Sequence, residues 1–352
     1  MSGQREEQVV DTPHIRILSV GTALPGPPVD NAALARRFGM DALWEQWVDA
    51  FIGTRSRHLA VDIETGEVRD SLSGLGEAAA RRALEGAGVR PDEVDLVVMA
   101  TATPEQLMPA TVNVICDRLG IDDVATYQLQ SGCSGAVQAL DVAHQMLRAG
   151  RHRTALVIGA DVLARFYDCD AELSKVPPDQ LVNYVLFGDG AGAAVLSTDP
   201  AAGRCELVSV RTRLTGLNRE AGATLEWFGP VDRLSERPAA TEDYKAIEWH
   251  VPEMSDETLR ELLDELDWRE EDVTYLLPPQ LSGRMTRRIV ERLGVTGAEE
   301  VSCVNTTGNN ANALVFFQLE RALERIAPGE RAIGIAIESS KWIKAGFALE
   351  GV

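Results

Sequence analysis

The chain has 352 residues, 45% of them hydrophobic, which is enough apolar material for one large domain or two coupled ones. Its formal net charge of −20 repels nucleic acid and anionic lipid at long range, so we expect neither as a partner. No apolar run approaches the length of a membrane span, and the polar N-terminus lacks the basic start and apolar core of a signal peptide. A cytoplasmic protein that does not enter a membrane is therefore expected.

The cysteine content argues against disulfides and metal sites. The cysteines are odd in number, and no Cys-x-x-Cys motif or Cys/His cluster with metal-ligand spacing occurs. We expect neither a disulfide framework nor a bound metal, which fits a reducing cytoplasm. The five are Cys116, Cys133, Cys169, Cys205 and Cys303.

Apolar runs of strand length alternate with helical periodicity along the chain. The first strand, helix, strand and helix of this series are expected at 15–24, 75–88, 94–103 and 110–120. Continuous apolar runs, typical of strands buried on both faces, occur at 95–101, 154–161 and 332–338. This alternation predicts a parallel α/β architecture.

The chain also contains an internal repeat. Residues 91–121 and 269–295 share an acidic turn, a strand, a loop with proline and a helix that closes on Arg-Leu-Gly. The segments that follow correspond as well, and the two Arg-Leu-Gly triplets lie 174 positions apart. The same shift carries Cys133 to the loop that contains Asn309. Duplicated halves would place these two loops together, one with a thiol and the other with asparagines.

The repeat divides the chain into two halves, 13–200 and 201–352, of which the first carries Cys133. Residues from about 201 to 250 are rich in Arg, Glu and Pro and have no counterpart in the repeat. We interpret them as an insertion in the second half. An insertion of this length is a natural wall for a substrate channel.

Cys133 is the candidate nucleophile. It lies among small residues, in SGCSG at 131–135, between an apolar run and an amphipathic helix. The small neighbours leave room beside the sulfur, and the amides at the start of the helix would favour a thiolate. These amides would also donate to an oxyanion when the sulfur attacks a carbonyl. The alternative is an inert, buried structural cysteine.

Several stretches together resemble the thiolase superfamily, and within it the ketoacyl synthase III group with its acyltransferase relatives of specialised metabolism. The most specific stretch is FGDGAGAAVL at 187–196, and others are SGCSGAVQAL at 131–140 and the Gly-Asn at 308–309. The resemblance spans nearly the whole chain. It implies an α/β thiolase fold with five layers, αβαβα, built from two duplicated halves. It also implies that Cys133 carries an acyl thioester and that the enzyme is a homodimer.

The resemblance further suggests which residues shape the substrate pocket. Met108 would reach across the dimer to close the acyl pocket of the second copy, or else be a plain core or interface residue. Phe316 and the insertion would shape the acyl pocket, together with Met108.

One catalytic position departs from the family pattern. Relatives that condense by decarboxylation pair the cysteine with an asparagine and a histidine; Asn309 matches the asparagine, but Pro279 stands where the histidine should be. A prolyl ring offers no donor to the enolate that decarboxylation generates, and losing one such donor costs roughly 10²–10³ in rate. Decarboxylative condensation is therefore not expected. Acyl transfer needs only an oxyanion hole and deprotonation of the entering nucleophile.

Another group must replace the missing histidine. His144 lies three helical turns beyond Cys133, which is too far, and of the remaining histidines only His250 stays open. Relatives carry a glycine-rich turn near Ser340, whose amide would join that of Cys133 in an oxyanion hole. Glu338 adds a carboxylate that the family pattern lacks, and it is a candidate general base or otherwise part of a salt bridge.

The expected donor is a carrier-protein thioester, delivered by its phosphopantetheine arm. In relatives that use coenzyme A, a tryptophan and an arginine four residues later hold the adenine. Trp47 matches the tryptophan, but Phe51 occupies the arginine position, which weakens the case for coenzyme A. Arg284, Arg287 and Arg288 match the basic patch on which relatives dock an acyl carrier protein, the alternative being a solvated helix face. No permanently bound cofactor is expected.

Three functions remain open. The leading one is an acyltransferase of natural-product biosynthesis, of the polyketide or antibiotic kind. It would move an acyl group from the carrier protein (or coenzyme A) through Cys133 to a hydroxyl or amine of a small acceptor, with Asn309 orienting the reactants. The second is a ketoacyl synthase III-type condensing enzyme with an unconventional base. The third is a catalytically weak partner subunit of a ketosynthase, against which the intact Cys133 argues.

Overall fold

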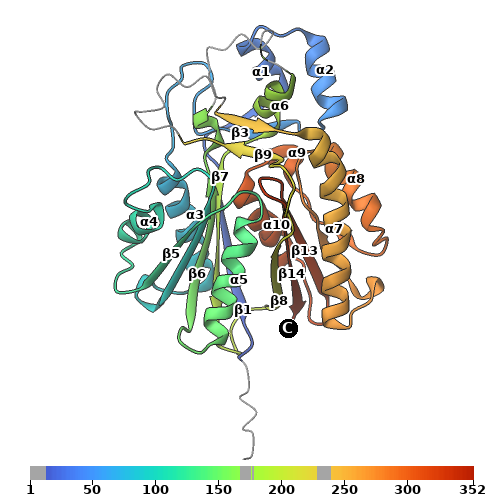
Figure 1. Cartoon of the computed structure of the whole chain (residues 1–352). Helices are drawn as coiled ribbons and strands as arrows, with labels where there is room; N and C mark the ends of the chain where they lie inside the picture. Colours follow the sequence, from blue (N-terminus) through green and yellow to red (C-terminus); the bar gives the residue numbers. More distant parts are fainter. Residues whose placement is uncertain (1–12, 167–175, 177, 228–238) are drawn as a thin grey trace, which may run out of the picture.

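Figure 1 shows the computed structural model of the chain, which describes residues 13–166, 176, 178–227 and 239–352. Within these residues one large sheet has the strand order β12-β11-β13-β14-β8-β1-β7-β6-β4-β5. Its strands are β1 (Arg16–Ala23), β4 (Leu96–Thr101), β5 (Ala125–Gln130), β6 (Thr154–Asp161), β7 (Gly190–Ser197), β8 (Cys205–Leu214), β11 (Tyr275–Leu277), β12 (Glu299–Glu300), β13 (Arg331–Glu338) and β14 (Ile343–Gly351).

The strand order is a mirror image about its centre. The first half runs β1-β7-β6-β4-β5 from the middle outwards, and the second runs β8-β14-β13-β11-β12 in the same sense. In each half the inner pairings are antiparallel and the outer ones are parallel. The halves join where β1 pairs with β8, through Arg16 opposite Glu206 and Ile17 opposite Cys205. This symmetry is the structural form of the repeat in the sequence.

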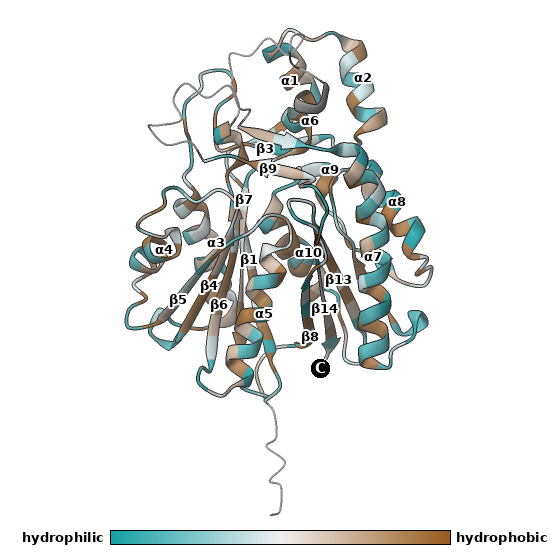
Figure 2. Ribbon diagram, in the orientation of Figure 1, coloured by the Kyte–Doolittle hydropathy of each residue, from teal (hydrophilic) through white to brown (hydrophobic). Residues whose placement is uncertain are grey.

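Helices complete the five-layered α/β fold that was expected. The central layer holds α5 (Gly135–Arg148) and α10 (Leu314–Leu323), each of which contacts strands of both halves (Figure 1). The outer layers hold α3 (Leu72–Ala87) and α4 (Thr111–Leu119) on one side and α7 (Tyr244–Leu266) and α8 (Gly283–Leu293) on the other. Figure 2 shows the hydrophilic faces of α7 and α8 turned outwards and apolar strands inside.

The burial of the strands explains why they could be predicted from the sequence. All positions of β4 and β7, and all but the first of β6 and β13, are buried. A strand covered on both faces needs apolar or small residues at every position, and burial of that surface is the main favourable free energy of folding. The central core joins strand residues of both halves to α5 and α10.

The structure differs from the sequence prediction at 201–250. Residues 205–214 form β8, which lies at the centre of the sheet, and α7 already begins at Tyr244. β8 therefore corresponds to β1, and α7 corresponds to α3. The repeat was missed here because β8 alternates in burial and α7 contains Pro252, so neither resembles its counterpart. Between β8 and α7, the described residues 215–227 and 239–243 lie outside the layered core.

A smaller group of elements, called the cap here, covers one end of the layers (Figure 1). The cap consists of β2 (Pro28–Asp30), α1 (Asn31–Arg37), α2 (Ala42–Phe51), β3 (Ser56–His58), α6 (Pro178–Leu186) and the β9–β10 ribbon (Ala223–Leu225 and Ala240–Glu242). The short helix α9 (Val304–Thr307) lies beneath it. The parallel strands β4, β5, β6, β11, β12 and β13 all present their carboxyl ends to the cap, the edge where α/β sheets bind ligands.

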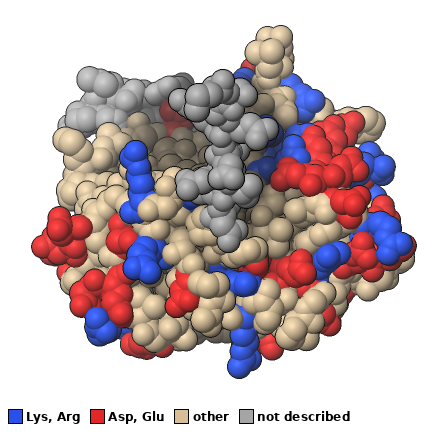
Figure 3. Space-filling view, turned by 90° about the horizontal axis from the view of Figure 1, so that it is seen from below, with Lys and Arg blue, Asp and Glu red and all other residues tan. Residues whose placement is uncertain are grey.

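The face opposite the cap carries mixed charges. Figure 3 shows Asp and Glu side chains interspersed with Lys and Arg there, without a continuous basic surface. Among the described residues, no helix has both the length and the apolar character that crossing a bilayer requires.

Candidate active site

Cys133 lies in the turn between β5 and α5, under the cap. The turn is held by the amide of Gly135, which donates to the carbonyl of Gly132 at 2.8 Å. Asn312, from the second half, donates through Nδ2 to the carbonyl of Ser131 at 2.9 Å. A side chain at position 135 would collide with Asn312 Oδ1, which explains the glycine. Cys133 keeps some exposure, whereas the other described cysteines, Cys116, Cys205 and Cys303, are buried.

A pocket of about 420 Å³ opens from Cys133 towards the cap. Its wall combines the β5–α5 turn, the turn after β13 with Ser340, α6, and the β9–β10 ribbon. Two carboxylates line it together with the thiol, Glu338 at the end of β13 and Glu242 at the end of β10. Glu338 was predicted from the sequence as a candidate base, whereas Glu242 was not.

Glu338 is buried and accepts hydrogen bonds from three serine hydroxyls. Ser131 and Ser134 each donate to Oε2 at 2.7 Å, and Ser340 donates to Oε1. Gln138 in turn donates to the oxygens of Ser131 and Ser134, at 2.7 and 2.8 Å. The carboxylate thus ties the turn that carries the thiol to the turn that carries Ser340.

The surroundings of Cys133 favour the neutral thiol. Burial raises the pKa of the Cys133 thiol above its usual value, and the negative charges of Glu338, Glu242 and Asp161 raise it further. Burial, together with the carboxylates, therefore outweighs the amides at the start of α5, from which the sequence predicted a thiolate. To act as a nucleophile, Cys133 would have to lose its proton during the reaction, which would need a nearby base.

Asn309 and Pro279 meet Cys133 at a second, smaller cavity of about 30 Å³. The side-chain oxygen of Asn309 accepts from the amide of Ala311 at 3.0 Å, which fixes its orientation. Pro279 is buried in the loop after β11, and its neighbour Gln280 accepts from the amides of Cys303 and Val304 at the start of α9. The structure thus brings Pro279 to the site, where its ring can neither donate nor accept a proton.

Histidine does not replace the missing base. None of the five histidines, all of which the structure describes, lines either cavity beside Cys133. His144 is buried on α5, where burial lowers the pKa of its imidazole. His250, which the sequence left open, packs edge-on against Trp342, with 4.9 Å between ring centroids.

Two of the residues expected to shape the acyl pocket lie elsewhere. Phe316 is fully buried in the central core, where its ring fills the space beside Gly159 and Gly192, and it lines neither cavity. Met108 is 85% exposed on the loop after β4, beside the exposed Leu107. Met108 is not among the described residues that line the two cavities beside Cys133.

The expected donor-binding residues gather where α2 meets α8. Trp47 stacks on Phe51 with 6.1 Å between ring centroids, and the Arg284 guanidinium lies 5.6 Å from the centre of the Phe51 ring. Arg288 pairs with Glu248 of α7. Arg287 is exposed and makes no ion pair with any described residue. Phe51 thus fills the place beside Trp47 where the resemblance led us to look for an arginine, and α2 contains no arginine.

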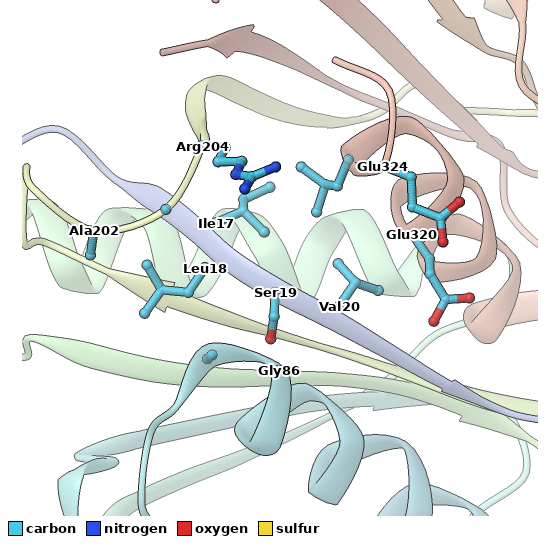
Figure 4. Close-up of a pocket in the computed structure, with 12 residues that line it drawn as sticks. Ile17, Leu18, Ser19, Val20, Gly86, Ala202, Arg204, Glu320 and Glu324 are labelled. Carbon is cyan, nitrogen blue, oxygen red and sulfur yellow. The ribbon is translucent and has the colours of Figure 1, made fainter. Parts of the chain in front are cut away.

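A separate cleft of about 690 Å³ lies at the seam between the halves (Figure 4). It forms where β1 shifts register between Ile17 and Ser19 and leaves β8. Glu320 of α10 and Glu324, which follows the last residue of α10, line the cleft, as does Arg204 on the loop before β8. No cysteine or histidine lines this cleft, so the chemistry of the site is assigned to the pocket at Cys133.

The chain matches two family models and many curated relatives. The model of 3-oxoacyl-(acyl-carrier-protein) synthase III matches residues 127–216, and the model of its C-terminal part matches residues 263–339. A β-ketoacyl-(acyl-carrier-protein) synthase III of Rhodospirillum centenum is 33% identical over 307 residues, covering 87% of this chain and 89% of the relative. One from Streptomyces coelicolor is 31% identical over 326 residues, covering 90% and 91%.

Several solved structures are similar to this chain as well. The structure described as AbyA1, a tetronic acid condensing enzyme, is 65% identical, with a TM-score of 0.93, and covers 96% of this chain and 100% of that one. The priming β-ketosynthase of the R1128 polyketide pathway is 27% identical, with a TM-score of 0.81 and coverage of 99% and 98%. The fold, the cysteine at the start of α5 and the extent of these matches show that the chain belongs to the ketoacyl synthase III family of the thiolase superfamily.

Proposed function

We propose that this protein is an acyltransferase of natural-product biosynthesis, in which Cys133 takes an acyl group from a thioester and passes it to a hydroxyl acceptor. The supporting observation is the composition of the site. The Cys133 thiol and two carboxylates line the larger pocket, and Asn309 and Pro279 line the smaller cavity beside Cys133. Pro279 occupies the position from which a histidine would assist decarboxylation. The amides of Cys133 and Ser340 are the proposed oxyanion donors, and Asn309 is proposed to orient the bound thioester.

The similarity to a tetronic acid condensing enzyme suggests what the product is. A tetronic acid is a five-membered lactone with two carbonyl carbons flanking C3. Assembling it from a β-ketoacyl chain and a 2-hydroxyacyl thioester requires one ester bond, formed by acyl transfer to the hydroxyl, and one carbon–carbon bond. The carbon between the two carbonyls of a β-ketoacyl ester is already acidic, so the second bond needs no decarboxylation. This reaction does not need a histidine at position 279, so it is compatible with the proline there. It includes both an acyl transfer and a condensation, the activities of the first two functions left open by the sequence.

The proposed donor is the phosphopantetheine thioester of an acyl carrier protein. Phe51 stacks between Trp47 and Arg284, so the arginine that would hold an adenine is absent from α2 and a cation lies on α8 instead. Arg287 presents a further charge beside Arg284, on a chain whose net charge is −20. A local basic surface on an acidic protein suits an acidic partner, because complementary charge steers association.

The proposed assembly is a homodimer paired through β5. Within the described sheet the two edge strands are β12 and β5. β12 is only two residues long and both are glutamates, a composition that protects an edge from pairing. β5 carries the uncharged sequence ATYQLQ, with Tyr127 44% exposed. An edge of this kind needs a partner, and Met108 on the neighbouring loop would then reach the second copy.

Intact-protein mass spectrometry tests the acyl transfer. Wild type and Cys133→Ala are mixed with β-ketoacyl and malonyl thioesters of a carrier protein, followed by a 2-hydroxyacyl thioester. We expect a mass gain equal to the whole β-ketoacyl group on wild type alone, which disappears as an ester product forms, with no carbon dioxide released from the malonyl thioester. Absence of any adduct on wild type would contradict the proposal and favour a partner-subunit role. Carbon dioxide release would favour decarboxylative condensation.

A further inference from the structure

We propose that Glu242, at the end of β10, accepts the proton of the acceptor hydroxyl and returns it to the Cys133 sulfur, in the role that histidine has in other cysteine enzymes. This inference rests on the proposed acyl transfer and assigns its proton path. Nothing in the sequence motifs points to Glu242, because it lies in the Glu-rich segment outside the internal repeat. The assignment comes from where the chain places it.

Backbone contacts hold the β9–β10 ribbon over the thiol. Glu242 pairs with Ala223 in the ribbon, and the amide of the preceding Gly222 donates to the carbonyl of Ser339 at 2.9 Å. The indole of the buried Trp342 donates to the carbonyl of Glu220 at 2.7 Å. The ribbon is therefore anchored to the same turn that carries Ser340, so Glu242 occupies a fixed place in the wall of the Cys133 pocket.

Glu338 is less suited to the proton transfer, although it is the carboxylate that the sequence suggested. Its Oε2 already accepts from two hydroxyls and its Oε1 from a third. Those donors occupy most of the positions at which a carboxylate accepts a proton. We therefore assign Glu338 a positioning role, in which it holds the turns of Cys133 and Ser340 together.

The surroundings of Glu242 give it a suitable acidity. Burial raises the pKa of Glu242 to about 7, and a hydrogen bond with Tyr244 acts in the opposite direction. The Tyr244 hydroxyl lies 2.6 Å from Asn183 Oδ1 of α6 as well, so its single proton is shared between these two acceptors. Among the described residues, the titratable groups that line the pocket with Glu242 are Cys133, Tyr184 and Glu338. A base with a pKa near the working pH exists in both protonation states, which is what proton transfer requires.

The proposed step conserves atoms and charge. The acceptor oxygen attacks the carbonyl carbon of the Cys133 thioester while its proton moves to the Glu242 carboxylate. The tetrahedral oxyanion collapses, the carbon–sulfur bond breaks, and its electron pair goes to the sulfur. Glu242 then gives its proton to that sulfur. Because the neighbouring carboxylates raise the pKa of the Cys133 thiol, the sulfur takes the proton readily. The ester leaves, and the thiol and the carboxylate are restored.

Single-turnover kinetics of preformed acyl-enzyme provide the test, because acylated Cys133 no longer titrates. Acyl transfer to the hydroxyl acceptor is followed across pH values on both sides of 7 for wild type and Glu242→Gln. In wild type we expect the rate to rise with pH and level off above the pKa of Glu242, since only the carboxylate accepts a proton. Glu242→Gln should transfer about 10²–10⁴-fold more slowly and lose this rise.

Two further variants distinguish a role of Glu242 in proton transfer from a purely structural role. Tyr244→Phe removes a hydrogen bond that lowers the pKa of Glu242, so the rise should move to higher pH. Glu64→Gln, at an exposed position in the cap region, is the matched control and should behave as wild type. A rise that persists in Glu242→Gln but disappears in Glu338→Gln would overturn the assignment. If wild-type Cys133 never acquires an acyl group, the proposed function itself fails, which is a distinguishable result.

Discussion

Glu338 and Glu242 place negative charge beside a thiol that must become nucleophilic. In many cysteine enzymes a neighbouring cation lowers the pKa of the thiol, whereas here both carboxylates raise it. The expected consequence is a resting enzyme with a protonated Cys133, protected from alkylation and oxidation until a thioester is bound. Cysteine reactivity depends on the fraction of thiolate, so this property is measurable in the free enzyme.

Neutralising either carboxylate should lower the pKa of the Cys133 thiol. The effect of Glu338→Gln should exceed that of Glu242→Gln, because Glu338 contributes more to raising it. The measurement is the rate of iodoacetamide alkylation of the peptide that contains Cys133, as a function of pH. In both variants alkylation should begin at lower pH than in wild type. An unchanged profile, or a move to higher pH in Glu338→Gln, would show that the carboxylates do not act on the thiol.

At the scale of the elements, the sequence predicted the strands and helices whose residue pattern repeats and missed β8 and α7, which repeat β1 and α3 in the structure but not in their residue pattern. Strands such as β4 and β13 are buried on both faces, so their apolar runs identify them without knowledge of the fold. β8 alternates between buried and half-buried positions and ends exposed, so it was assigned to an insertion although it lies at the centre of the sheet. Burial pattern, and not position in the sheet, decided which strands could be recognised.

The candidate site was predictable only in part, for a related reason. Cys133, Asn309 and Pro279 lie in loops that follow repeated strands, where the family pattern gives each position a meaning. Glu242 belongs to the unrepeated segment and reaches Cys133 only because the β9–β10 ribbon is anchored to the turn after β13. Contacts between segments so far apart in the chain leave no local pattern in the sequence.

The arrangement of α2 and α8 leads to a prediction about the donor. Arg284 stacks on Phe51 and Arg288 pairs with Glu248, which leaves the charge of Arg287 for a partner. Arg287→Glu should raise the KM for a carrier-protein thioester roughly tenfold and weaken its dependence on salt, because rim charges act mainly on association. The kcat with a short pantetheine thioester should not change.

Arg292→Glu provides the control for this prediction. It makes the same charge change on the same exposed helix, in the last turn of α8, away from the cap. Equal effects of the two variants would mean that net charge, rather than a docking surface at the start of α8, controls the KM.

At the scale of the whole molecule, the unequal edges of the sheet lead to the last prediction. Tyr127→Glu places a charge on the unpaired edge of β5, where it would face its own copy in a symmetric pairing and repel it. The variant should be monomeric by light scattering, whereas the proposed assembly predicts a dimeric wild type. Leu43→Glu, which adds the same charge at a 70% exposed apolar position of α2, should remain dimeric.

Dimerisation should also control acyl selectivity, because the exposed Met108 would complete the pocket of the second copy. Met108→Ala is therefore expected to stay dimeric while accepting longer or bulkier acyl groups onto Cys133. Monomeric Tyr127→Glu should lose the same selectivity without any change in the pocket of its own chain. If the monomer instead keeps the wild-type preference, the pocket is complete within one chain and Met108 is a surface residue. Together the two variants distinguish a role of Met108 in assembly from a role in the pocket. Only a role in the pocket predicts altered acyl selectivity in a variant that is still dimeric.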